Sequence, residues 1–142
     1  MDTIELPRRI VNQLLAQALS TPDTEICGLI AGLDGHPTDC YPVANVSTQP
    51  QYQFQLDPAQ QIAALRRMRE QGETLFAIYH SHPSTPATPS VADIQQASYP
   101  DALYLIISLH TTGTLQMRGY RLLDHQFHPI NVSITDPRDP PF

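Results

Sequence analysis

Proline is the feature that most restricts how this chain can fold. The 142 residues include 14 prolines, about twice the ordinary frequency of ~5%. Proline has no amide hydrogen and is therefore poorly tolerated inside helices and central strands. Most of these prolines lie between periodic segments, at positions 37, 42, 50, 83, 86, 89 and 100 and in the tail after residue 135. We interpret them as loop residues that separate short helices and strands.

The length and composition fit one folded domain. Hydrophobic residues make up 41% of the chain, which is enough for a core, and charged residues only 15%. No apolar run approaches the ~18 residues that a membrane-spanning helix needs. We expect a single domain over residues 1–135 and a loose tail at 136–142.

The charge distribution argues against a nucleic-acid partner. The formal net charge is −6, and all eight basic residues are arginine. Their only cluster, Arg66, Arg67 and Arg69, falls on a predicted helix, and we interpret it as a solvated helix face. A nucleic-acid-binding domain would need a basic stripe on a basic domain.

The two cysteines, Cys27 and Cys40, have neither CxxC spacing nor a secretory signal before them. A reduced cytoplasmic protein without a disulfide is therefore the default expectation. Cys27 lies in an apolar run, and we interpret it as a small buried hydrophobic residue.

Two amphipathic helices and one short helix are predicted. The first covers residues 7–20, with apolar residues recurring at helical spacing. The second begins at Asp57-Pro58, an N-cap followed by proline at the first helical position, and ends at Gly72. Ile62, Leu65 and Met68 are expected on its inward face. A short helix is predicted over Ser90–Ser98.

Strands are predicted between these helices. Alternating or continuous apolar runs bounded by turn residues occur at 25–32, 40–47, 51–56, 74–82, 102–109, 115–123 and, more weakly, 127–134. Asp34-Gly35 and Thr112-Gly113 are expected to form turns between neighbouring strands. The order is a helix, three strands, a helix, a strand, a short helix and two or three strands. It predicts an α/β fold with a mixed sheet flanked by helices.

The segment His80-Ser81-His82-Pro83 carries the clearest chemical signal. Two histidines at i and i+2 at the end of a strand point to the same side of the sheet and can reach one ion. Asp93 falls in the first turn of the following helix, and the stiff loop at 83–89 is short enough to return that turn to the strand end. Two imidazoles and one carboxylate form the open three-ligand pattern of catalytic zinc. One Zn²⁺ per chain is therefore expected.

Such a site needs a proton shuttle that does not bind the metal. Glu25 is the candidate, because it is an ionisable residue at the start of an apolar strand. Its alternative is an exposed residue at a strand end. Ser90 also has two interpretations: it begins a Ser-x-x-acid helix start and is therefore a candidate N-cap, which does not exclude a role near the metal. For His80 and His82, the alternative is a pair of structural loop-edge histidines.

The same residues resemble the motif of the JAMM (MPN+) metalloprotease family. Glu25 with Cys27-Gly28-Leu29-Ile30 is followed by His80-x-His82-Pro83, then six residues and Ser90-x-x-Asp93. The resemblance covers nearly the whole chain and implies a cytidine-deaminase-like α/β fold. It also implies His80, His82 and Asp93 as zinc ligands, Glu25 as general acid and base, and Ser90 as a stabiliser of the oxyanion.

The resemblance further implies hydrolysis of a peptide or isopeptide bond after the C-terminal Gly-Gly of a ubiquitin-like protein. Because the stretch from Ser98 to Ala102 leaves no room for an insertion, the chain is similar to small stand-alone bacterial members, which process ubiquitin-like sulfur carriers. A homodimer is possible through an apolar sheet edge.

Three alternatives remain open at this point. A zinc nucleobase deaminase would need H-x-E followed by P-C-x-x-C, and neither is present. A catalytically silent MPN-type scaffold or binding module would usually lack the histidines or the glutamate. A structural zinc site would more often be closed by four protein ligands, and Cys27 or Cys40 could supply the fourth only if the fold brought it close.

Overall fold

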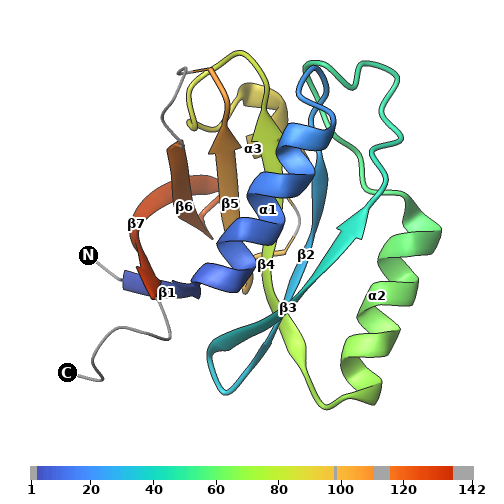
Figure 1. Cartoon of the computed structure of the whole chain (residues 1–142), viewed down its shortest axis with the longest axis vertical. Coiled ribbons are helices and arrows are strands. Elements are labelled where there is room, and N and C mark those ends of the chain that lie inside the picture. The colour runs from blue at the N-terminus through green and yellow to red at the C-terminus, as the bar shows by residue number, and fades with distance from the viewer. Residues whose placement is uncertain (1–2, 98, 111–115, 136–142) are drawn as a thin grey trace.

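The computed structural model describes residues 3–97, 99–110 and 116–135, which form one seven-stranded sheet and three helices (Figure 1). The elements follow the chain as β1 (Thr3–Pro7), α1 (Arg8–Ser20), β2 (Cys27–Leu33), β3 (His36–Val43), α2 (Pro58–Glu70), β4 (Thr74–His82), α3 (Val91–Gln96), β5 (Leu103–Ser108), β6 (Gln116–Leu123) and β7 (Gln126–Thr135). The predicted tail at 136–142 and the turn at Thr112-Gly113 lie outside the described residues.

The sheet is mixed, as the sequence predicts. Its strand order is β1-β7-β6-β5-β4-β2-β3. Strands β4 and β5 are parallel neighbours, β1 is parallel to β7, and the other pairs are antiparallel. Every residue of β5 is buried, which explains why its sequence is an unbroken apolar run rather than an alternating one. The predicted α/β fold class is therefore confirmed.

Helices cover both faces of the sheet and create two hydrophobic cores. On one face, α1 buries Ile10, Leu14 and neighbouring residues against β2, β4 and β5. On the opposite face, α2 buries Ala64 and Met68. Figure 1 shows the two helices on different sides of the central strands. Within the described part of the chain, no helix is long and apolar enough to cross a membrane.

Several local predictions are confirmed in detail. Asp34 and Gly35 have φ angles of 52° and 80°, so they form a tight two-residue hairpin turn in which both residues are left-handed. Asp57 is the N-cap of α2, and its carboxylate accepts a hydrogen bond of 3.1 Å from the amide of Ala59. Pro58 occupies the first helical position, which needs no amide hydrogen. The strand predicted at 74–82 matches β4 residue for residue.

Other predictions are wrong where long-range contacts decide. Residues 51–56 form turns and one isolated bridge between Asn45 and Leu56 instead of a strand. The strand predicted at 40–47 begins four residues earlier, because β3 pairs with β2 from the hairpin turn onwards. Strand β1 was not predicted. It is a five-residue edge strand that pairs with β7 at the far end of the chain.

The inward face of α2 also differs from the prediction. Ile62 is 57% exposed, whereas Ala64 is buried beside Met68. Leu65 is half-buried and packs at the edge of the same core. The face of α2 that packs on the sheet is therefore centred on Ala64 and Met68, and Ile62 faces outward.

Candidate metal centre

His80 and His82 stand at the carboxyl end of β4, on the same side of the sheet. One residue separates them, and strand side chains alternate between faces, so both imidazoles point toward the face that α2 partly covers. Both side chains are buried, and their Nε2 atoms lie 3.1 Å apart. The predicted convergence of the two histidines is therefore present in the structure.

Asp93 reaches the same point from α3. Its Oδ2 atom lies 3.1 Å from His80 Nε2 and 3.1 Å from His82 Nε2. The same oxygen accepts a hydrogen bond of 2.9 Å from the amide of Ser90, and Ser90 Oγ accepts one of 3.0 Å from the amide of Asp93. This reciprocal pair is a capping box, so the N-cap interpretation of Ser90 is confirmed. The cap fixes the Asp93 carboxylate and leaves the Ser90 hydroxyl proton free to donate.

The proline-rich loop between β4 and α3 is held at several points. Ser108 Oγ donates to the Thr85 carbonyl at 2.6 Å. The Ala87 carbonyl accepts a hydrogen bond of 2.7 Å from the Tyr120 hydroxyl, and the Ala87 amide donates to Gln116 Oε1 at 3.0 Å. Strands β5 and β6 thus anchor the loop that returns Asp93 to the end of β4.

Glu25 completes the cluster from a third direction. It lies two residues before β2, rather than inside the strand as predicted, and is only 4% exposed. One ligand atom from each of Glu25, His80, His82 and Asp93 can be chosen so that all four lie within 4.8 Å of one another. Burial, with a further contribution from the charge of Asp93, raises the pKa of Glu25 from 4.5 to about 8.

The protonation states of the cluster fit a cation between its atoms. His82 Nδ1 lies 2.8 Å from the Pro86 carbonyl oxygen, which can only accept, so Nδ1 carries the proton and Nε2 of the neutral ring offers a lone pair. Burial lowers the pKa of His80, which favours its neutral ring. Burial acts in the same direction on His82, but its hydrogen bonds with Asp93 and Pro86 outweigh burial and raise its pKa, so a cation at this site would compete with a proton on His82. Asp93 is buried, which by itself would raise its pKa, yet hydrogen bonds with the two histidines hold that pKa below its usual range.

The spacing of these atoms also suits a metal ion. Three ligand atoms at the corners of a tetrahedron around zinc, with bonds of about 2.0–2.1 Å, lie roughly 3.3 Å apart. The observed separations are all 3.1 Å. In addition, Glu25 Oε1 is buried without a hydrogen-bond partner, as expected of a carboxylate beside a site that a ligand would fill. His80, His82 and Asp93 therefore fit a divalent metal, with Glu25 beside it.

The cysteines do not join this group. Cys27 Sγ interacts with the Val43 carbonyl at 3.4 Å, and burial raises the pKa of the thiol to about 12. Burial likewise raises the pKa of Cys40 to about 11. Among the described residues, the metal-compatible cluster contains neither thiol. A structural site closed by a cysteine ligand is therefore not supported.

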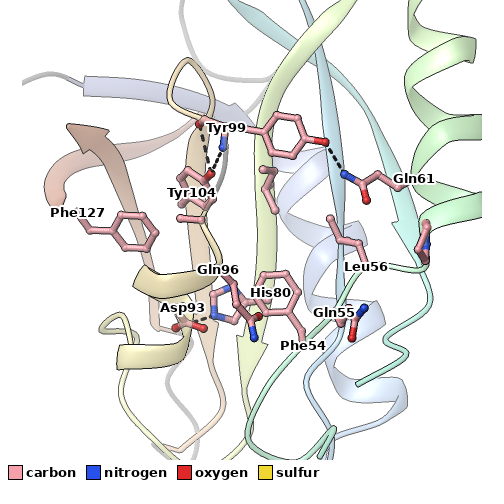
Figure 2. A pocket seen from close by; sticks show the side chains of 13 residues that line it. Phe54, Gln55, Leu56, Gln61, His80, Asp93, Gln96, Tyr99, Tyr104 and Phe127 are labelled. Atoms are coloured by element: carbon pink, nitrogen blue, oxygen red, sulfur yellow. Dashed lines mark hydrogen bonds and ion pairs between the residues drawn. The ribbon is translucent and has the colours of Figure 1, made fainter. Parts of the chain in front are cut away.

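A pocket of about 540 Å³ opens beside His80 and Asp93 (Figure 2). Its wall is aromatic and amide-rich, and apart from these two cluster residues no lining residue is charged or a histidine. The remaining lining residues are Phe54, Gln55, Leu56, Pro58, Gln61, Ile78, Gln96, Ala97, Tyr99, Tyr104 and Phe127. Gln61 donates to the Tyr99 hydroxyl and so links α2 to the segment that follows α3. The cluster thus faces a neutral pocket large enough for part of an extended peptide.

One wall of this pocket could not be predicted from the sequence. Phe54 was assigned to a strand, yet its ring stacks on His80, with ring centroids 4.4 Å apart and an interplanar angle of 21°. Asn45, which was placed in a strand without any role, binds the backbone of this same segment. The only sequence signal was a pair of aromatic residues in a segment rich in glutamine, which indicates a strand as readily as a binding loop.

The chain is similar to known proteins in both sequence and structure. The family model described as prokaryotic homologs of the JAB domain matches residues 7–122. A CysO-cysteine peptidase of Mycobacterium tuberculosis is 34% identical over 127 residues, which cover 87% of this chain and 86% of that protein. A desampylase of Haloferax volcanii is 37% identical over 119 residues, with coverage of 82% and 83%. The solution structure of a Desulfitobacterium hafniense protein superposes with a TM-score of 0.84 at 31% identity, covering 94% of this chain and 93% of that one.

Proposed function

This chain belongs to the family of prokaryotic homologues of the JAB domain, and we propose that it is a zinc-dependent peptidase. Its reaction is hydrolysis of the peptide or isopeptide bond that follows the C-terminal Gly-Gly of a small ubiquitin-like or sulfur-carrier protein. The observation that carries the proposal is the buried group Glu25, His80, His82 and Asp93 at the edge of a pocket. We assign the activity to a single domain over residues 1–135.

In this proposal His80, His82 and Asp93 hold the metal, and the pocket brings the scissile bond to it. Zinc bound there would supply a Lewis acid that polarises the carbonyl and acidifies water near neutral pH. The hydrogen bond from His82 Nδ1 to Pro86 and that from the Ser90 amide to Asp93 keep two of the three ligands oriented. Such supporting contacts typically change metal affinity or activity by about 10- to 100-fold.

Glu25 is proposed to move the proton. Its carboxylate, buried and without a partner at Oε1, takes a proton from the attacking water and then delivers it to the leaving amine. A nearby dication would favour the ionised carboxylate and so lower the raised pKa of Glu25 toward neutrality. Ser90 donates its free hydroxyl proton to the oxyanion, because its oxygen is already oriented by the amide of Asp93.

The pocket supports a peptide tail as substrate. Side-chain amides of Gln55, Gln61 and Gln96 can both donate and accept, as the peptide backbone does. A glycine-rich tail has no side chains to keep its backbone away from the metal. The similar proteins named as a CysO-cysteine peptidase and a desampylase support the same substrate class. We further expect the protein to act in the cytoplasm, without nucleic acid or membrane partners, and to be capable of forming a homodimer.

The experiment compares Gly-Gly-tailed fusions of a sulfur-carrier protein and of ubiquitin as substrates for the purified protein. We expect cleavage after Gly-Gly of the sulfur-carrier fusion, and loss of that cleavage with a chelator or in Glu25→Gln. Metal analysis of protein purified without added zinc should give about one zinc per chain in the wild type and far less in His82→Ala. His128→Ala is the matched control, because His128 is an exposed histidine on β7.

Two results would reject the proposal. Cleavage that survives in Glu25→Gln would remove the proton-transfer role of this residue and with it the assigned mechanism. A zinc content that is far below one and unchanged by His82→Ala would remove the metal site. A protein that binds zinc and the fusion but never cleaves it would instead be a catalytically silent binding module.

A further inference from the structure

Asn45 lies just after β3 and uses every hydrogen-bonding position of its side-chain amide. Its Nδ2 donates to the carbonyl oxygens of Glu25 and Gln53, both at 3.0 Å. Its Oδ1 accepts from the amides of Ser47 and Gln55, also at 3.0 Å. A carboxamide offers two donors and two acceptor lone pairs, so the hydrogen-bonding capacity of Asn45 is fully met.

We propose that Asn45 is a positioning residue that sets the place of Glu25 relative to His80. The inference rests on the proposed function, because it concerns how that reaction is organised. Asn45 is not part of the metal-compatible cluster and does not line the pocket. It acts through two other residues: Glu25, whose carbonyl it binds, and Phe54, whose neighbours in the chain it holds.

Glu25 depends on this contact because it precedes β2 and has no partner strand. Pairing of β2 with β4 begins at Cys27 opposite His80. Ahead of that pair, Ser81 accepts a hydrogen bond from the Ile26 amide at 2.9 Å and donates its own amide to the Ile26 carbonyl at 3.0 Å. The Glu25 amide donates to the carbonyl of Pro50 at 2.8 Å. Among the described residues, Asn45 is the hydrogen-bond partner of the Glu25 carbonyl, and this bond would be lost without it.

The backbone position of Glu25 matters because no hydrogen bond holds one of its two carboxylate oxygens. Glu25 Oε1 has no hydrogen-bond partner, so the backbone decides where the carboxylate lies relative to the two histidines and Asp93. Displacing a catalytic group by about 1 Å can cost on the order of 100-fold in rate. A single hydrogen bond to the Glu25 carbonyl can therefore influence the reaction without touching the substrate.

The hydrogen bonds of Asn45 with residues 53 and 55 position the residue that covers His80. Asn45 binds the carbonyl of Gln53 and the amide of Gln55, and Phe54 lies between these two. The Phe54 ring stacks on the imidazole of His80 (Figure 2). The Asn45 side chain thus holds both Glu25, the proposed proton carrier, and the segment of Phe54, whose ring covers His80. The distance between Glu25 and Phe54 therefore stays constant.

The test uses a variant that cuts only one half of the Asn45 contacts. In Asn45→Asp, the carboxylate still accepts from the amides of Ser47 and Gln55, so the loop keeps its own turn, but both donors to Glu25 and Gln53 are lost. Asn45→Ala removes all four bonds and serves if the aspartate variant does not fold. Ser47→Ala is the matched control, because it removes one side-chain bond of the same loop, from the Gln49 amide at 3.1 Å, without affecting Glu25.

We expect Asn45→Asp to lower kcat on the Gly-Gly fusion by about 10- to 100-fold. Zinc affinity, measured by chelator competition, should change by less than about threefold, because β4 and α3 carry all three ligands and the Asn45 side chain binds none of them. Hydrogen exchange at the amides of Glu25 and Ile26 should be faster than in the wild type. Ser47→Ala should leave kcat within about twofold of the wild type, because Ser47 is a half-buried loop residue that does not bind Glu25.

Other outcomes would overturn the inference. An unchanged kcat in Asn45→Asp, or a loss confined to KM, would mean that the loop only shapes the pocket. Parallel losses of kcat, zinc affinity and melting temperature, shared by Ser47→Ala, would mean that Asn45 only stabilises the fold. If the wild type cleaves neither fusion, the proposed function fails, and hydrogen exchange at Glu25 and Ile26 still decides whether Asn45 positions this segment.

Discussion

Replacing Glu25 with glutamine is expected to change how the stability of the zinc-free protein depends on pH. Glu25 is 4% exposed, and burial raises its pKa from the ordinary 4.5 to about 8. The folded protein therefore keeps a proton that the unfolded chain releases above pH 4.5. The stabilising contribution of Glu25 is fully present below about pH 4.5 and is lost as the pH rises toward 8.

The size of the effect follows from the same pKa. One pKa unit corresponds to about 1.4 kcal/mol, so the rise of Glu25 from 4.5 to about 8 corresponds to about 3–5 kcal/mol of unfolding free energy. Glutamine does not titrate and keeps nearly the same shape. Relative to the wild type, Glu25→Gln should therefore become more stable by about this amount between pH 4.5 and pH 8. Small domains have only about 5–15 kcal/mol of stability in total, so the difference is large.

Urea denaturation in the presence of a chelator measures this directly. Far-ultraviolet circular dichroism is a suitable probe, because the chain has no tryptophan. The other titrating groups of the cluster are common to both proteins, so the difference between the two curves contains the titration of Glu25 together with its coupling to His82. Added zinc should flatten the wild-type profile, since a cation favours the ionised carboxylate. Parallel profiles for the two zinc-free proteins would refute the reasoning, because they would mean that Glu25 is not buried against the cluster.

Substitutions at four further positions test other parts of the structure. Ser90→Ala should lower stability by about 1 kcal/mol through loss of the N-cap. It should also lower kcat by about 100- to 1,000-fold through loss of the oxyanion donor. Ser90→Thr should keep most of the stability and of the activity in urea denaturation and fusion-cleavage assays. Gly28→Ala should destabilise by at least about 1–3 kcal/mol, because its Cβ would lie 2.6 Å from a backbone oxygen and closer to the Tyr79 ring. Gly35→Ala, where nothing lies within 4 Å but φ is +80°, should cost only about 1 kcal/mol in the same assay. Leu14→Ala, at a fully buried position of α1, should cost about 2–5 kcal/mol, and kcat per folded molecule should remain unchanged.

Features that depend on neighbouring residues could be predicted from the sequence. The alternation of strand side chains placed His80 and His82 on one side of β4, and the structure agrees. The Ser-x-x-acid pattern placed Asp93 in the first turn of a helix, where the capping box fixes it. The hairpin at Asp34-Gly35 follows from φ preferences within two residues. In each case the deciding interactions span a few residues, so composition and spacing are sufficient.

Features that depend on distant residues needed the tertiary structure. Residues 51–56 alternate like a strand but form turns, because Asn45 satisfies their backbone groups in place of a neighbouring strand. Strand β1 forms because β7 offers it an edge more than 120 residues away in the chain. Glu25 meets the histidines because Ser81 and Asn45 hold its segment across 55 and 20 residues of sequence. Such contacts depend on how distant strands are arranged in the complete sheet, and short-range sequence patterns do not determine that arrangement.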